Sequence, residues 1–256
     1  MMDLHTPTVI GYWSDRSQSV GRPRSVDELA ATTRAFLDTL TAIDPALVPE
    51  LLLLGEHQSG RPADLSIDGL RRIYQRRKRD DPPTGSYVSG YGVHFVHPDH
   101  RQRQSPHLIV GKTGRTPNVV HVTLPRPEHA VGDASELLTA RVGDAVLKAI
   151  LDHWNAENGR LSVSKYSRPQ RELGIDFTGL DALDRQRAIN TRLAKELKIG
   201  WETLIPPQVP LDHTLLPAVA DTETVTTGTL VRLGDAPLDV DFEDILDLRR
   251  ALGYPT

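Results

Sequence analysis

The sequence predicts an α+β fold, in which a mostly antiparallel sheet carries helices packed against it within a single domain over residues 1–256. Three patterns predict it. A short apolar stretch at residues 9–13 precedes a long amphipathic stretch that ends near residue 45. Between residues 86 and 124 the apolar period changes to two, as in strands, and turns containing Gly and Pro separate the runs. A further amphipathic stretch closes the chain at residues 242–252.

The first predicted strand, residues 9–13, leads into the longest predicted helix. Ser25 can cap this helix, and Glu28 completes the spacing of a capping box, in which each side chain bonds a backbone N–H left open at the helix start. One helical face carries Val26, Leu29, Ala30, Thr33, Phe36, Leu37 and Leu40. Such a stripe has to be buried against another element. Asp44 precedes Pro45 and is therefore pushed out of helical geometry, so the helix ends there.

A second helix is predicted at residues 66–78, before the strand-rich middle of the chain. Its buried side is expected to carry Ile67, Leu70, Ile73 and Tyr74. Strands are predicted at residues 86–89, 92–96, 107–110 and 118–124. Most of the turns between them are shorter than the roughly twelve residues of a parallel crossover, so neighbouring strands are expected to be antiparallel.

The second half of the chain is predicted to mix helices with short strands. A helix at residues 135–155 is expected to be closed by Asn158 and Gly159, which favour the left-handed conformation that ends many helices. Further strands are predicted at residues 161–164, 217–220 and 226–233, and a short strand or turn at residues 200–205. The remaining predicted helices are a surface helix at residues 181–197 and the final helix at residues 242–252.

Composition is typical of a folded protein and excludes several functions. Hydrophobic residues make up 38% of the chain and charged residues 25%, which argues against disorder. With a net charge of −4, the whole chain has no electrostatic footprint for nucleic acid. The absence of Cys excludes disulfides, thiolate metal sites and a cysteine nucleophile. No secretory signal and no apolar run of ~20 residues is evident, so we expect a cytoplasmic protein without membrane contact.

Short motifs spread over most of the chain carry a family resemblance. The opening combines Tyr12-Trp13, a loop with Arg16, and an amphipathic helix that ends at Ile43-Asp44-Pro45. Later features are a Gly-led strand at Gly92, a strand over residues 118–125, a helix, Gly200-Trp201 with Thr203, and residues 228–231 before an acidic stretch and a final helix. In this order the motifs resemble the immunity protein 52 family. Departures from the family pattern occur at residues 21–24, 51–54 and 168–198.

The resemblance implies an antitoxin and not an enzyme. Members of this family guard a bacterium against its own polymorphic toxins, which often carry a nuclease domain of restriction-endonuclease type. Because such a protein works by stoichiometric binding, the resemblance implies no catalytic residue, no metal and no cofactor. The implied partner is the cognate toxin, and neither nucleic acid nor membrane is an expected partner. Residues 1–256 are then expected to form one immunity-protein-like α+β domain.

Acidic residues near the end of the chain are the predicted partner-binding residues. Between Asp212 and Asp247 the sequence has nine acidic residues and a single Arg, Arg232. The predicted binding set is Asp235, Asp239, Asp241, Glu243 and Asp244. A nuclease presents positive charge to nucleic acid, so an acidic face can steer to that surface and cover it. The same acids also have a purely structural interpretation, since first-turn carboxylates favour the dipole of the last helix.

Two alternatives stay open from the residues alone. His94, His97, His100 and the nearby His107 suggest a metal-dependent hydrolase, because imidazole is a common zinc ligand, although exposed loop histidines are the simpler interpretation. The basic residues at 71–79 suggest a nucleic-acid-binding module, because guanidinium groups suit phosphates. A solvated helix end followed by two aspartates is the simpler interpretation there.

Overall fold

The structure is a computed structural model that describes residues 7–13, 24–48, 51–54, 62–77, 91–96, 105–110, 118–124, 139–163, 166, 169–170, 173, 175, 178–179, 181–193, 196–237 and 239–256. Contacts divide the chain into an amino-terminal unit, Thr8–Gly159, and a carboxy-terminal unit, Arg160–Thr256 together with Met1–Pro7. The predicted α+β class, with mostly antiparallel pairing and packed helices, is confirmed. The assignment of residues 1–256 to one immunity-protein-like domain stays a prediction.

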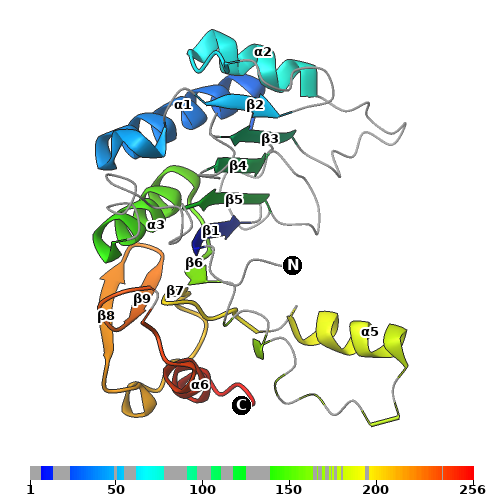
Figure 1. Cartoon of the computed structure of the whole chain (residues 1–256), viewed down its shortest axis with the longest axis vertical. Coiled ribbons are helices and arrows are strands. Elements are labelled where there is room, and N and C mark those ends of the chain that lie inside the picture. Colours follow the sequence, from blue (N-terminus) through cyan, green and yellow to red (C-terminus); the bar gives the residue numbers. More distant parts are fainter. Residues whose placement is uncertain are drawn as a thin grey trace. The chain divides into compact units, whose positions relative to one another are not determined.

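The amino-terminal unit is built on an antiparallel sheet (Figure 1). Its spatial order is β2 (Leu52–Leu54), β3 (Tyr91–Val96), β4 (Ser105–Val110), β5 (Asn118–Thr123) and β1 (Pro7–Trp13). Each neighbouring pair in this order is antiparallel. For β3–β4 and β4–β5 this pairing was predicted from the short turns. The strands predicted at residues 92–96, 107–110 and 118–124 are confirmed, whereas the one predicted at residues 86–89 lies outside the described residues.

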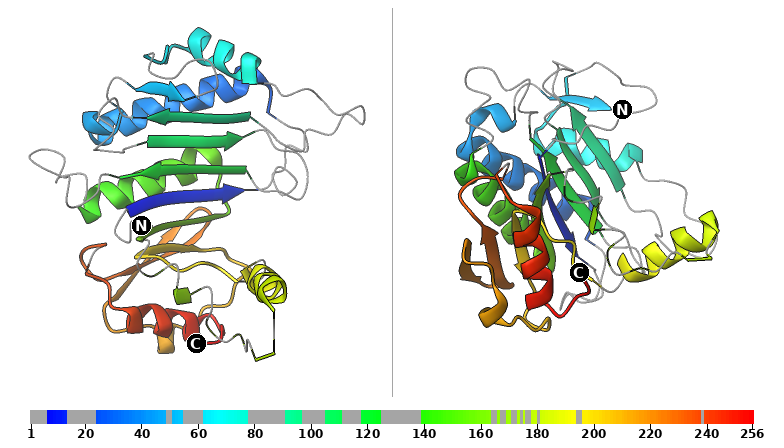
Figure 2. Two further views of the ribbon diagram at one scale, coloured as in Figure 1. Left: turned by 45° about the vertical axis from the view of Figure 1, so that its right-hand side comes forward. Right: turned by 60° about the horizontal axis from the view of Figure 1, so that its bottom comes forward.

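One face of this sheet forms the core with two helices. Burial alternates along β1, β3 and β5, so every second side chain points into the core. Helices α1 (Val26–Ile43) and α3 (Ala140–Trp154) lie across that face (Figures 1 and 2). Trp13 of β1 stacks on Trp154 of α3 with ring centroids 5.4 Å apart, and Phe36 of α1 meets Trp154 edge-on at 6.2 Å. Three buried aromatic rings therefore join the sheet to both helices.

Helix α1 begins and ends where its sequence signals predict. Ser25 Oγ accepts a hydrogen bond from the Glu28 backbone N–H at 3.2 Å, and the Glu28 carboxylate accepts one from the Ser25 N–H at 2.7 Å. Six of the seven predicted stripe residues are buried, and Val26 in the first turn is half-buried. Asp44 has extended backbone geometry and precedes the short 3-10 helix η1 (Pro45–Leu47). The capping box and the proline stop are confirmed.

Helix α2 (Ile67–Arg77) packs against α1 and the sheet. Its Tyr74 is fully buried, and the Tyr74 hydroxyl lies 2.7 Å from the hydroxyl of Thr33 in α1. The Tyr74 ring also meets Tyr91 of β3 edge-on, with centroids 5.6 Å apart. The predicted burial of Leu70, Ile73 and Tyr74 is confirmed, but that of Ile67 is wrong. Ile67 is 46% exposed because it is the first residue of the helix and no helical turn precedes it to cover its side chain.

Helix α3 ends within one residue of its predicted end, but other residues close it than the sequence suggests. Thr139 caps its start, and Asn155 ends it in the left-handed conformation, with φ at 49°. The prediction that Asn158 and Gly159 close the helix is wrong, since both belong to β6 (Asn158–Val163). Asn, like Gly, tolerates the left-handed region, so Asn155 ends the helix in place of the Asn158-Gly159 pair. Gly159 is needed for space, because a Cβ there would press on the side chains of Leu147 and Leu151 of α3 at 3.0 and 3.1 Å.

The carboxy-terminal unit has its own antiparallel strands. Their order is β6, β7 (Glu202–Ile205), β9 (Gly228–Leu233) and β8 (Ala220–Val225). Helix α5 (Ala182–Leu193) is shorter than predicted, whereas α6 (Phe242–Ala251) matches its predicted span to within one residue. The strand predicted at residues 217–220 is wrong, because the 3-10 helix η4 (His213–Leu215) and a turn come first and β8 starts at Ala220. The strand predicted at residues 226–233 starts late, since Thr226 and Thr227 form the tight turn between β8 and β9.

Buried charges fix the end of α6. Arg249 is only 2% exposed, and its Nη2 donates to Glu196 at 2.8 Å and to the Pro255 carbonyl at 2.7 Å. Its guanidinium also lies 5.6 Å from the ring centroid of Tyr254. The Tyr254 hydroxyl in turn accepts a hydrogen bond from the Leu197 backbone N–H at 3.2 Å. These bonds hold the last residues of the chain against α6 and the segment before β7.

Candidate partner-binding surface

The five acidic residues predicted to bind a partner lie on one short stretch between β9 and the first turn of α6. We call this stretch the acidic segment: Asp235, Asp239, Asp241, Glu243 and Asp244. Four of them are exposed, and Asp244 is half-buried. The four exposed carboxylates have no ion-pair partner among the described residues. Their charge is therefore directed to solvent.

Buried neighbours anchor the backbone of the acidic segment. Pro237 and Val240 are buried between the exposed acids, and the buried Tyr166 donates its hydroxyl to the Pro237 carbonyl. Burial raises the pKa of Tyr166, so its phenol stays protonated and can donate this bond. The backbone is thus held at Pro237 and Val240, and such anchoring lowers the entropy lost when a partner binds.

At the start of α6, Asp244 has a structural role that the exposed acids of the segment do not share. Asp244 accepts a hydrogen bond from the backbone N–H of Asp241, the residue that precedes the helix. Partial burial, followed by the charges of Asp241 and Asp247, raises the pKa of Asp244. Asp244 therefore takes part in capping the start of the helix, whereas Glu243 in the same turn is exposed. Of the predicted set, Asp244 is the least suited to contact a partner.

Three other acids of the same acidic run have intramolecular roles. Asp212 caps η4 by accepting bonds from the Thr214 hydroxyl at 2.6 Å and the Thr214 N–H at 2.9 Å, and these bonds lower the pKa of Asp212. Asp247 forms an ion pair with Arg250. On β8, Asp221 accepts the backbone N–H of Thr222 at 2.9 Å. These three acids stabilise local structure, so the acids of the run that remain are the acidic segment and Glu223 of β8.

The single Arg of the acidic run proves to be part of the fold. Arg232 on β9 lies directly across from Glu202 on β7 and from Asp221 on β8. Its Nη2 donates to the fully buried Glu202 carboxylate at 3.0 Å, and Asp221 lies 3.6 Å from its Nη1. The guanidinium also lies 5.5 Å from the ring centroid of Trp201. Sequence analysis missed this row because it depends on the register of three strands.

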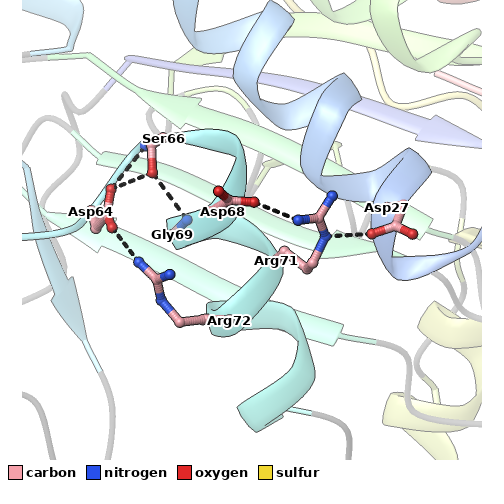
Figure 3. A network of polar contacts seen from close by, with 7 residues as sticks. All are labelled: Asp27, Asp64, Ser66, Asp68, Gly69, Arg71 and Arg72. Carbon is pink, nitrogen blue, oxygen red and sulfur yellow. Dashed lines mark hydrogen bonds and ion pairs between the residues drawn. The ribbon is translucent and has the colours of Figure 1, made fainter.

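The basic residues on α2 are largely paired (Figure 3). Arg71 forms ion pairs with Asp27 of α1 and with Asp68, and Arg72 donates to Asp64 at 2.6 Å. Arg76 is exposed and has no ion-pair partner within the part of the chain that the structure describes. The Arg77 side chain and residues 78–79 lie outside that part. The predicted basic surface over residues 71–79 therefore has two of its cations neutralised by neighbouring carboxylates.

The histidine cluster takes a different form from the one predicted. His94 on β3 lies directly across from His107 on β4, which lies directly across from His121 on β5. His97 and His100, which sequence analysis grouped with His94, are outside the described residues. The side chains that the structure describes include no group of three or more His, Asp or Glu residues able to hold a metal ion. His121 was missed because its place beside His107 follows from the register and not from spacing along the chain.

No protein-family model matches the chain, and no curated protein matches it. The resemblance to the immunity protein 52 family therefore stays a prediction. None of the helices in the described ranges is long and apolar enough to span a bilayer. Fold and surface together define an α+β protein that presents an anchored acidic segment.

Proposed function

We propose that this protein is an immunity protein, an antitoxin that binds a cognate bacterial polymorphic toxin in the cytoplasm. It neutralises the toxin by covering the active surface, and it performs no reaction itself. The toxin carries a nuclease domain of restriction-endonuclease-like type. Besides the family resemblance, one observation supports the proposal: four exposed carboxylates stand on a segment whose backbone is anchored by Tyr166.

Charge gives the physical reason for this pairing. A nuclease needs a cationic surface to hold its polyanionic substrate. Four exposed carboxylates in one short stretch attract such a surface over several ångströms and raise the rate of association. An inhibitor that occupies the same cations as the nucleic acid also excludes the substrate. Binding and inhibition then share a single set of contacts.

Charge alone does not hold two proteins together, and an apolar contact lies next to the acidic segment. Val219 is 48% exposed, and its carbonyl accepts the backbone N–H of Gly234 at 3.0 Å, immediately before Asp235. Leu215, 50% exposed, lies four residues earlier in η4. Tight interfaces combine an apolar centre with a polar rim. Val219 beside the acids supplies such a combination.

The test is binding to the product of the gene next to this one. Purified protein and toxin domain are mixed at about 50 mM and about 300 mM salt, and association rates are measured by surface plasmon resonance. The variant Asp239→Lys/Glu243→Lys is expected to associate about tenfold more slowly at low salt, because reversing rim charges acts mainly on the association rate. High salt should reduce the difference. Coexpression of the variant should protect cells less well than the original chain.

The control is Asp152→Lys, a single charge reversal at an exposed position of α3, which is compared with the single reversal Glu243→Lys. It is expected to leave the association rate within about twofold, since a lone charge outside an interface steers weakly. Equal slowing by Asp152→Lys would mean that net charge, and not the acidic segment, controls association. Absence of binding at micromolar concentration, or cell death despite abundant folded antitoxin, would refute the proposed function itself.

A further inference from the structure

A small pocket lies beside α2 in the amino-terminal unit, away from the acidic segment in sequence. Its volume is about 190 Å³. The lining residues are Leu53, Pro62, Ala63, Asp64, Gly69, Arg72, Ile73 and Arg76. Half of these residues are aliphatic, and the charged ones are a single carboxylate and two guanidinium groups. The pocket thus joins an apolar wall to a net positive charge.

The two arginines lie on the same face of α2. Arg72 and Arg76 are four residues apart, which places them one helical turn from each other. Arg76 is exposed and has no ion-pair partner among the described residues. Arg72 gives only its Nη2 to Asp64, and in the described part of the chain its Nε and Nη1 donate to no other group. Several guanidinium N–H donors at the pocket are therefore available to a ligand.

The carboxylate of the pocket is already engaged. Asp64 Oδ1 accepts bonds from the Ser66 hydroxyl at 2.7 Å and the Ser66 N–H at 3.1 Å, while Oδ2 accepts from Arg72 (Figure 3). Ser66 Oγ accepts the Gly69 N–H at 3.0 Å, which ties this turn to the start of α2. A Cβ at position 69 would overlap both the backbone and the carboxyl group of Asp64. Gly69 therefore lets the turn carrying Asp64 lie close to the helix.

From this arrangement we infer that the pocket binds a compact phosphate monoester, with its phosphoryl group on Arg76 and Arg72 and its apolar body against Leu53 and Ile73. Guanidinium forks match phosphoryl oxygens in geometry and charge. A cavity of about 150 Å³ holds a benzene ring, whereas pockets for larger ligands start near 300 Å³. A volume of about 190 Å³ therefore suits a small phosphorylated molecule. This inference does not depend on the proposed function.

In the experiment, the protein is titrated separately with phenyl phosphate, inorganic phosphate and phenol in a phosphate-free buffer. Isothermal titration calorimetry measures the binding. Phenyl phosphate is expected to bind saturably with a Kd on the order of 1 mM, as befits a ligand of this size. Inorganic phosphate should bind more weakly because it lacks the apolar body, and phenol should show no saturation. Saturable binding of phenyl phosphate alone does not locate the site, so variants decide.

Three substitutions locate the site, because each is expected to change the Kd for phenyl phosphate differently. Arg76→Gln is expected to weaken phenyl phosphate binding about tenfold or more, through loss of a charge-assisted bond. Arg71→Gln removes the same charge from the same helix outside the pocket and should change the Kd by less than about twofold. Asp64→Asn keeps an oxygen for Ser66 but removes the competing negative charge, so binding should tighten.

Several results would overturn the inference. Equal weakening by Arg76→Gln and Arg71→Gln would show a general charge effect without a site. No saturation by about 20 mM phenyl phosphate in the original chain would mean that the pocket is not used. Weaker binding in Asp64→Asn, with an unchanged circular dichroism spectrum, would contradict the role given to that carboxylate. Inorganic phosphate binding as tightly as phenyl phosphate would refute the apolar part of the site.

Discussion

The hydrogen bond between Thr33 and Tyr74 offers a direct test of how α2 is held on α1. Both residues are fully buried, and their hydroxyl oxygens lie 2.7 Å apart. Thr33→Val and Tyr74→Phe each remove one hydroxyl with little change in shape, and each leaves the other hydroxyl without its partner. Such a buried unsatisfied group costs about 1–3 kcal/mol of unfolding free energy.

The two single substitutions are not expected to cost the same. When Tyr74 becomes Phe, the Thr33 hydroxyl can turn to the carbonyl of Leu29, four residues earlier in its own helix, so we expect a loss of about 1 kcal/mol. The Tyr74 hydroxyl is held at the end of a fixed ring and has no such substitute, so Thr33→Val should cost about 2 kcal/mol. The double variant removes both groups together and should cost about 1–2 kcal/mol, less than the sum.

Urea denaturation followed by circular dichroism measures these free energies, with an unchanged slope m as the sign that the unfolded state is unaffected. A double variant that costs the full sum of the two singles would mean that the two hydroxyls do not interact. Thr33→Val costing less than Tyr74→Phe would refute the explanation through the helix carbonyl.

Three further experiments test other parts of the fold. Gly11→Ala should lower stability by about 1–3 kcal/mol in thermal melts, because the added Cβ would overlap the side chain of Ile150. Arg249→Met should cost about 3 kcal/mol in urea unfolding, since it leaves the Glu196 carboxylate without its cation, and adding Glu196→Gln should recover part of the loss. Burial lowers the pKa of His153, so the unfolded chain binds the proton first as pH falls. The free energy of unfolding should therefore increase with pH from about 5 to about 7, and His153→Gln should flatten that increase.

Local signals in the sequence predicted much of the amino-terminal unit. The capping box of Ser25 and Glu28 involves residues three positions apart, and both of its bonds form as expected. The helical stripe and the two-residue period of the strands likewise depend on near neighbours. Such features follow from local backbone geometry, so a single sequence contains enough information to predict them.

Strand β8 shows where periodicity fails. All four of its inner residues, 221–224, are polar and exposed, so neither face carries an apolar pattern. The strand forms because β9 lies beside it and a tight turn joins the two. Helix α3 shows a second limit, since both Asn155 and the Asn158-Gly159 pair could end a helix, and in the structure Asn155 does so while the pair belongs to β6.

The candidate surface was predictable in charge but not in pairing. That Asp239 or Glu243 would be exposed follows from their polar surroundings in sequence. That Arg71 meets Asp27, 44 positions away, or that Arg232 meets Glu202, 30 positions away, follows only from the tertiary arrangement. The same limit applies to the pocket beside α2, whose walls come from Leu53, residues 62–64 and α2.

Strand β8 also has a consequence for how the protein behaves when many copies are present. It is the outermost of the described carboxy-terminal strands, a position from which sheets of separate molecules can fuse into aggregates. Here the Asp221 carboxylate accepts a hydrogen bond from the backbone N–H of Thr222, and another acid, Glu223, follows two residues after Asp221. A second copy approaching this margin meets a blocked donor and charges of its own sign. The acidic residues of β8 therefore oppose polymerisation at the strand where edge-to-edge pairing between molecules would otherwise begin.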